Sequence, residues 1–147
     1  MYFWETQKII TSFYACCAKP VCEKYGLTQM ELDILLFLKN NPPFDTAAQI
    51  IKMRRLTKSH VSGAVKALQE KGLLAAGFRE GNHKEIHLCI TPQALPVVED
   101  GLSAQETFGR RLFSGFSAQE GELCQQLYRR ICQNAREGLE ENEEWNS

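Results

Sequence analysis

The sequence predicts a mainly α-helical fold with one small β-hairpin. Apolar residues recur at helical spacing in six segments, and most of these segments begin with a capping residue and end near glycine or proline. Only residues 73–91 change to the alternating pattern of a strand. A length of 147 residues suits one domain over residues 1–147 with a hydrophobic core of its own.

The composition is that of a soluble globular protein, with 44% hydrophobic and 24% charged residues. No apolar run approaches the roughly 20 residues that cross a bilayer, and the N-terminus does not have the pattern of a signal peptide. We therefore expect a cytoplasmic location. Because the cytoplasm is reducing, we expect free thiols, mostly buried, at Cys16, Cys17, Cys22, Cys89, Cys124 and Cys132, none of which forms a C-x-x-C pair.

Two helices are predicted before residue 40. The first covers residues 3–25, is expected to kink at Pro20, and has an apolar stripe made of Phe3, Ile10, Phe13, Tyr14, Cys17 and Val21. Thr28 followed by Glu31 is the pattern of a capping box. It opens a second helix that is apolar enough to lie in the core.

A helix-turn-helix is predicted next. Thr46 and Gln49 form a further capping-box pattern, which opens a short helix over residues 46–53. After a turn, Leu56–Leu73 reads as the second helix of the pair, with Thr57 as its N-cap and an apolar face made of Val61, Ala64, Val65 and Leu68. Two helices joined by a few residues are typical of this motif.

The outward face of that second helix favours nucleic-acid binding over an ordinary solvated helix surface. It presents Lys58, Ser59, Ser62 and Lys66, with His60 at its margin. We expect the serines and His60 to read base edges, because their short polar groups are directional. The lysines are expected to hold phosphates.

A β-hairpin is predicted after the helix-turn-helix. Ile86, Leu88 and Ile90 alternate with Glu85, His87 and Cys89, and Gly81 and Asn82 supply the turn. The hairpin tip carries three basic side chains, those of Arg79, His83 and Lys84. A helix-turn-helix followed by a basic hairpin is a winged helix, which we favour over a plain surface ribbon. We expect His83 and His87 to face solvent or phosphate rather than to bind zinc.

The apolar stripes of the last two predicted helices indicate a dimer. Thr91 and Pro92 open a helix to about residue 113, and Ser117 with Glu120 opens another. Their apolar stripes, like that of the first helix, have little adjacent core to cover them. We therefore expect residues 1–25 and 92–138 to form a dimerisation region. The acidic tail, residues 139–147, is expected to fray.

The charge is segregated along the chain, although the net charge is only −1. Between Lys52 and Lys84 there are eight basic and two acidic residues, whereas the eleven residues after Arg136 contain five acids and no base. This distribution suits a phosphate-binding face in residues 28–91, the predicted winged helix.

Several blocks, in order, resemble the MarR (multiple antibiotic resistance regulator) family of bacterial transcription factors. They are GLTQMELDILLFL, TAAQIIKMRRLTKSHVSGAVKALQEKGLL and NHKEIHLCIT. The resemblance implies a homodimer of triangular outline with interleaved terminal helices and with winged helices in successive major grooves. It also implies release from DNA by small anionic or phenolic ligands, or by oxidants.

The sequence departs from the family pattern in two respects. Asn82 and Lys84 stand where the family's wing usually has an Asp-x-Arg pair, so a salt bridge is not expected there. Gly63 stands where many relatives have a bulky polar or basic residue. Either a DNA contact is lost at Gly63 or the backbone approaches DNA more closely.

The sequence thus predicts a sequence-specific regulator that binds double-stranded DNA, a dimeric repressor released from a pseudo-palindromic operator by a small phenolic or anionic effector. Two alternatives stay open: redox sensing through Cys16 and Cys17, and a winged-helix protein-interaction module. No enzyme motif, cofactor site or metal site is apparent, and effector-binding residues cannot be assigned. The predicted DNA-contacting residues are Arg54, Arg55, Lys58, Ser59, His60, Ser62, Lys66, Arg79, His83 and Lys84.

Overall fold

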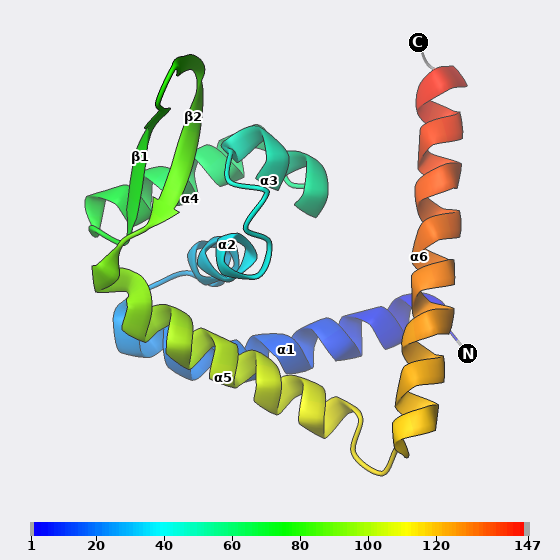
Figure 1. Cartoon of the computed structure of the whole chain (residues 1–147). Helices are drawn as coiled ribbons and strands as arrows, with labels where there is room; N and C mark the ends of the chain where they lie inside the picture. Colours follow the sequence, from blue (N-terminus) through cyan, green and yellow to red (C-terminus); the bar gives the residue numbers. More distant parts are fainter. Residues whose placement is uncertain (1, 146–147) are drawn as a thin grey trace. The chain divides into compact units, whose positions relative to one another are not determined.

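The computed structural model describes residues 2–145 and confirms the mainly helical fold with one β-hairpin (Figure 1). No helix in this described part is long and apolar enough to cross a membrane. The elements are α1 (Phe3–Tyr25), α2 (Gln29–Asn40), α3 (Ala47–Arg54), α4 (Lys58–Glu70), β1 (Leu74–Arg79), β2 (Asn82–Ile90), a short 3-10 helix (Pro92–Ala94), α5 (Leu95–Leu112) and α6 (Ala118–Trp145).

The chain divides into two compact units, one up to Phe108 and one from Gly109 onward. No residue of α6 up to Glu143 is buried within the single chain. The single domain stays a prediction. The first unit contains the helix-turn-helix, the hairpin and α1. The second unit consists of the end of α5, a turn and α6.

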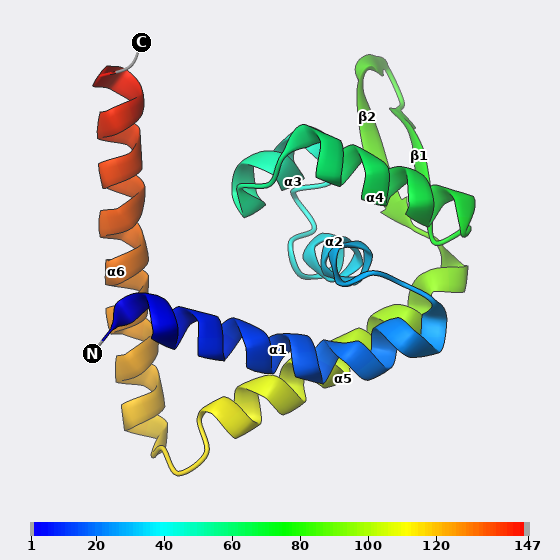
Figure 2. The same ribbon diagram turned by 180° about the vertical axis from the view of Figure 1, so that it is seen from behind.

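The core of the first unit is built around α2, over which α3 and α4 lie (Figure 2). The helix α2 is buried along most of its length, with Leu32, Ile34, Leu35 and Leu36 at most 1% exposed. Ile50 of α3 and the apolar face of α4 close the core from the other side. This packing fixes α4 by one face and leaves its opposite face exposed.

The N-caps form as predicted except at Thr28, where only half of the capping box forms, and at Thr91, whose hydroxyl donates to the Gly72 carbonyl instead of capping. Thr46 and Gln49 form a complete capping box, and the Thr57 side chain accepts a hydrogen bond from the His60 amide. Thr28 caps α2 by accepting from the Glu31 amide, but the predicted reciprocal bond is absent from the described hydrogen bonds. Glu31 is buried, and its carboxylate instead pairs with Lys71 Nζ at 2.6 Å. An ion pair with a buried carboxylate thus replaces half of the capping box.

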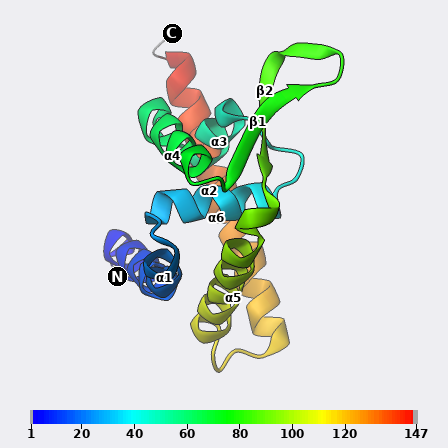
Figure 3. The same cartoon turned by 90° about the vertical axis from the view of Figure 1, so that its left-hand side faces the viewer.

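The hairpin is antiparallel and pairs Leu74 with Ile90 and Gly77 with His87, with an irregularity between Gly77 and Arg79. Figure 3 shows the hairpin extending beyond the helices of the first unit. Ile86 is 56% exposed, so the alternating apolar pattern reaches the core only near the base of the hairpin, at Leu88.

The helix α6 runs into the acidic tail, whose fraying stays a prediction. It continues to Trp145, and the Asn142 side chain donates a hydrogen bond to the Gly138 carbonyl. Glutamate is a good helix former, so the acidic composition does not by itself end the helix. Of the predicted tail, residues 146–147 lie outside the described part.

Candidate nucleic-acid interface

The exposed face of α4 gathers the side chains predicted to contact DNA. Val61, Ala64, Val65 and Leu68 are buried, whereas Lys58, Ser59, His60, Ser62 and Lys66 are all exposed. Lys66 forms a long ion pair of 4.0 Å with Glu70, one turn further along the helix. Both partners are more than two-thirds exposed, so this pair contributes little and does not compete strongly with a phosphate.

The turn before α4 places two arginines beside this face. Arg55 ends α3 in the left-handed conformation, with φ of 50°, which is uncommon for a residue other than glycine. Its amide donates to the Ile51 carbonyl, so the turn is closed by the backbone. Arg54 is 45% exposed, and its Nη2 lies 3.8 Å from Asp33 Oδ2.

Asp33 connects Arg54 to the helices behind it. The Tyr14 hydroxyl of α1 donates to Asp33 Oδ1 at 3.2 Å, and Gln105 Nε2 of α5 donates to Tyr14 at 3.4 Å. Burial raises the pKa of Asp33, although the Arg54 charge and the Tyr14 hydrogen bond oppose that rise. The pKa of Tyr14 is also raised, chiefly by burial. A polar network therefore joins α5, α1 and α2 to the turn that precedes α4.

Asp45, in the loop before α3, holds the hairpin against the helices. Its carboxylate accepts from Arg79 Nη2 of β1 at 2.6 Å and lies 2.7 Å from His87 Nδ1 of β2. Its carbonyl accepts from the Leu88 amide at 2.7 Å. Partial burial favours a higher pKa for Asp45, but the hydrogen bonds from His87 and Arg79 outweigh it and lower the pKa. Both strands are thus tied to one carboxylate.

This arrangement corrects the sequence analysis at His87. The residue was expected to face solvent or phosphate, but it is 9% exposed. The loop that carries Asp45 runs beside β2 and covers the strand face on which His87 lies, whereas Leu88 faces the core on the opposite side. Both consecutive residues are therefore buried. Arg79 is 62% exposed but is committed to Asp45 in the described structure. Arg79 therefore helps to hold the hairpin in place and also adds to its positive charge.

The hairpin tip keeps its predicted exposure. His83 and Lys84 are exposed, and the His83 ring packs edge-on against Phe78 with centroids 5.4 Å apart. The Asn82 side chain accepts a hydrogen bond from the Lys84 amide at 2.9 Å. This local turn bond uses the Lys84 backbone amide and leaves the Lys84 side chain to act as a point charge.

The expectation that most thiols are buried is wrong for the single chain. Only Cys22 is buried, whereas Cys16, Cys89 and Cys124 are exposed and Cys17 and Cys132 are intermediate. Burial raises the pKa of Cys22. Because burial does not protect Cys16, the redox-sensing alternative stays open. Among residues 2–145, no group of three or more histidine, cysteine or acidic side chains is placed to hold a metal ion.

Neither Asp33 nor Asp45 was among the residues predicted to shape the interface. Each aspartate lies far in the sequence from at least one of its partners, so no local spacing announces the contact. The only available signal was their place among apolar or turn residues next to the basic segment.

Comparison with known proteins gives a family-model match to the MarR family over residues 25–84. A sequence search among curated proteins found no match. Solved structures are similar over most of the chain, at identities that establish the fold alone.

Three of these structures illustrate the likeness. A putative MarR family transcriptional regulator from Listeria monocytogenes, complexed with 26mer DNA, has a TM-score of 0.79 at 14% identity, covering 91% of this chain and 88% of that one. The S. aureus MepR–DNA complex has a TM-score of 0.77 at 18% identity, covering 92% and 96%. Bordetella bronchiseptica BpsR, whose DNA binding is regulated by 6-hydroxynicotinic acid, has a TM-score of 0.71 at 16% identity, covering 90% and 99%.

The segment matched by the family model is the segment that folds here as the helix-turn-helix and most of the hairpin. The helices on either side of it follow the same fold as the solved relatives. Residues 25–84 are therefore similar to the MarR family, and most of the chain shares the fold of solved MarR-family structures.

Proposed function

We propose that the protein is a sequence-specific regulator that binds double-stranded DNA through α4 and the hairpin. The main support is the exposed face of α4, which combines two lysines with short hydroxyl and imidazole side chains. A helix with such a face enters a major groove, and a basic hairpin beside it reaches the flanking backbone or minor groove. Binding to chromosomal DNA would place its action in the cytoplasm, as the sequence analysis expected.

Ser59, His60 and Ser62 are assigned to base edges, and Lys58 and Lys66 to phosphates. Arg54, Arg55, His83 and Lys84 supply further charge or hydrogen bonds around them, and Arg79 does so while it anchors the hairpin. Replacing Lys66 by alanine should weaken operator and random duplexes alike and lower the salt slope by about one unit. Ser62→Ala should cost about 1–3 kcal/mol on the operator only. Equal weakening of both duplexes by Ser62→Ala would contradict this division.

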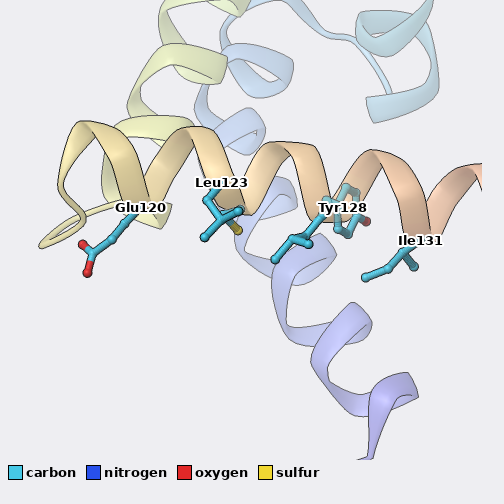
Figure 4. A pocket seen from close by; sticks show the side chains of 6 residues that line it. Glu120, Leu123, Tyr128 and Ile131 are labelled. Atoms are coloured by element: carbon cyan, nitrogen blue, oxygen red, sulfur yellow. The ribbon is translucent and has the colours of Figure 1, made fainter.

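The active form is proposed to be a homodimer built from residues 1–25 and 92–138. The helix α6 carries a stripe of large apolar side chains that are about half exposed: Leu123 54%, Leu127 46%, Tyr128 50% and Ile131 48%. A groove of about 300 Å³ runs along them, and Leu123 and Ile131 project from the same side of the helix (Figure 4). Contiguous exposed apolar surface of this kind is typical of an interface.

A two-fold dimer would present two copies of α4 to half-sites about one helical turn, roughly 10 base pairs, apart. Sedimentation at micromolar concentration tests the dimer, and a stable folded monomer would contradict it. Replacing Leu127 by aspartate should produce that monomer, because it puts a charge in the middle of the apolar stripe. The matched control is Leu139→Asp, beyond the proposed dimerisation residues, which should leave the dimer intact.

We further propose that the dimer is a repressor released from DNA by a small phenolic or anionic effector. The support is the similarity in fold to a regulator whose DNA binding responds to 6-hydroxynicotinic acid. Titrating aromatic acids and phenols into the protein–duplex complex, with fluorescence anisotropy as readout, tests the idea. Release should leave the protein folded and dimeric, which distinguishes it from denaturation.

A further inference from the structure

Gly63 lies in the middle of the exposed face of α4. It comes four residues after Ser59 and three before Lys66, so the three share one side of the helix, opposite Val61 and Leu68. Glycine inside a helix is less favourable than alanine, because it loses more backbone freedom on folding. Some other benefit must offset this cost.

No contact among residues 2–145 accounts for glycine at this position. A Cβ added to Gly63 would have no atom within 4 Å, and Gly63 is not among the glycines with positive φ. Gly101 shows the contrast, because a Cβ there would lie 2.8 Å from Leu36 Cδ2. Packing therefore explains Gly101 but not Gly63. Gly109, Gly121 and Gly138 also have open space at the Cβ, and Gly63 differs from them in lying among the polar side chains of the exposed α4 face.

The surface at Gly63 is nonpolar and recessed. The backbone amide and carbonyl groups in mid-helix are used by the helix itself, so the residue presents only its Cα hydrogens. A groove of about 400 Å³ runs beside it, lined by Thr28, Met30, Glu31, His60, Gly63 and Ala64. The Glu31 carboxylate in that lining is neutralised by Lys71. A group seated against Gly63 thus meets no hydrogen-bond donor or acceptor from this residue.

We propose that Gly63 receives the 5-methyl group of a thymine, which makes it a specificity-determining residue of the DNA-binding face; the inference rests on the proposed function. In the major groove the thymine methyl is the apolar feature of the base edges, whereas the other exposed groups of the bases donate or accept hydrogen bonds. A polar edge placed against Gly63 would lose its water without gaining a partner, which is unfavourable. Ser59 and Ser62 flank the position and read polar edges, while the missing Cβ lets the helix approach.

The test begins with duplexes enriched from a random library by the wild-type protein. Each thymine in one half-site is replaced in turn by deoxyuridine, which removes only the methyl group. At one position the wild type should lose about fourfold in affinity, the equivalent of about 0.8 kcal/mol for one buried carbon group. Gly63→Ala should bind the enriched duplex about tenfold more weakly and should no longer distinguish thymine from deoxyuridine there.

Two controls separate this effect from changes in folding. Gly63→Ala should have a melting temperature equal to or above that of the wild type, because alanine is the better helix former. Ser62→Ala should lose affinity yet keep the thymine preference at the same position. The inference is overturned if no thymine responds to loss of its methyl, or if Gly63→Ala keeps wild-type affinity and preference. If the library yields no enriched duplex, the proposed function falls, and this inference falls with it.

Discussion

Replacing Asp45 by alanine should loosen the hairpin and destabilise the first unit. The change removes the acceptor for His87, whose side chain is 10% exposed, and the partner of Arg79, whose side chain is 62% exposed. The buried contact is expected to contribute about 1.5–3 kcal/mol, as hydrogen bonds to charged groups do. The exposed pair is expected to add at most about 1 kcal/mol. We therefore expect a loss of about 2–3 kcal/mol at pH 7, measured by urea unfolding.

A double-mutant cycle tests which partner matters more. Combining Asp45→Ala with His87→Ala should give a larger coupling energy than combining it with Arg79→Ala, because the histidine contact is shielded from water. The Leu88 amide bond to the Asp45 carbonyl is kept in every variant, so the loop stays in register. A larger coupling to Arg79, or a loss below about 0.5 kcal/mol in Asp45→Ala, would refute the reasoning.

The same contact predicts a pH dependence with a definite sign. Because the pKa of Asp45 is lowered in the folded protein, the carboxylate contributes its full stabilisation above its unfolded pKa of about 4. That contribution is lost as the pH falls through the lowered folded value. The difference in unfolding free energy between the wild type and Asp45→Ala should therefore be constant from pH 5 upward to neutrality and shrink toward pH 3. A difference that grows on acidification would contradict the assignment.

The remaining predictions concern Asp33, the thiols and Arg55. Burial raises the pKa of Asp33, so its charged form destabilises the folded protein above that pKa. Asp33→Asn should therefore leave the unfolding free energy at pH 7 unchanged or raise it by up to about 1 kcal/mol. A loss above 1 kcal/mol would show that the Arg54 pair outweighs burial. In alkylation of the native protein followed by mass spectrometry, Cys16 should react faster than Cys22. Cys124 should become protected from alkylation as the protein concentration rises through the dimerisation range. Equal labelling of Cys124 in monomer and dimer would show that it lies outside the interface. Arg55→Gly should raise stability by about 1 kcal/mol, because it relieves a left-handed backbone, yet weaken DNA binding; unchanged DNA binding would remove Arg55 from the interface.

The sequence predicted the elements well because their signals are local. Thr46, Thr57 and Ser117 act as caps in the structure, and the apolar face of α4 is buried as its spacing indicated. The exposed face of α4 followed directly, since helical periodicity assigns both faces at once. These features depend on residues within one or two turns of each other.

The contacts that position the interface depend on residues far apart in the chain. Glu31 has the spacing of a capping box, but Lys71, forty residues away, competes for its carboxylate. His87 alternates like an outward-facing residue, but the loop at Asp45 covers its strand face. Exposure of the thiols was misjudged for a related reason: cysteine is usually buried, but Cys124 is exposed and lies in the half-exposed apolar stripe of α6.

The central claim, that α4 and the hairpin form a DNA-binding face, is tested most directly by a salt titration on random duplex DNA. Fluorescence anisotropy should show binding at low salt, with log affinity falling linearly as log salt rises. The slope should drop by about one unit in Lys58→Ala and again in Lys66→Ala, while a control change at the exposed Lys19 of α1 leaves it unaltered. Absence of binding at low salt, in a protein shown to be folded and dimeric, would contradict the account and favour a winged helix that serves protein interaction instead.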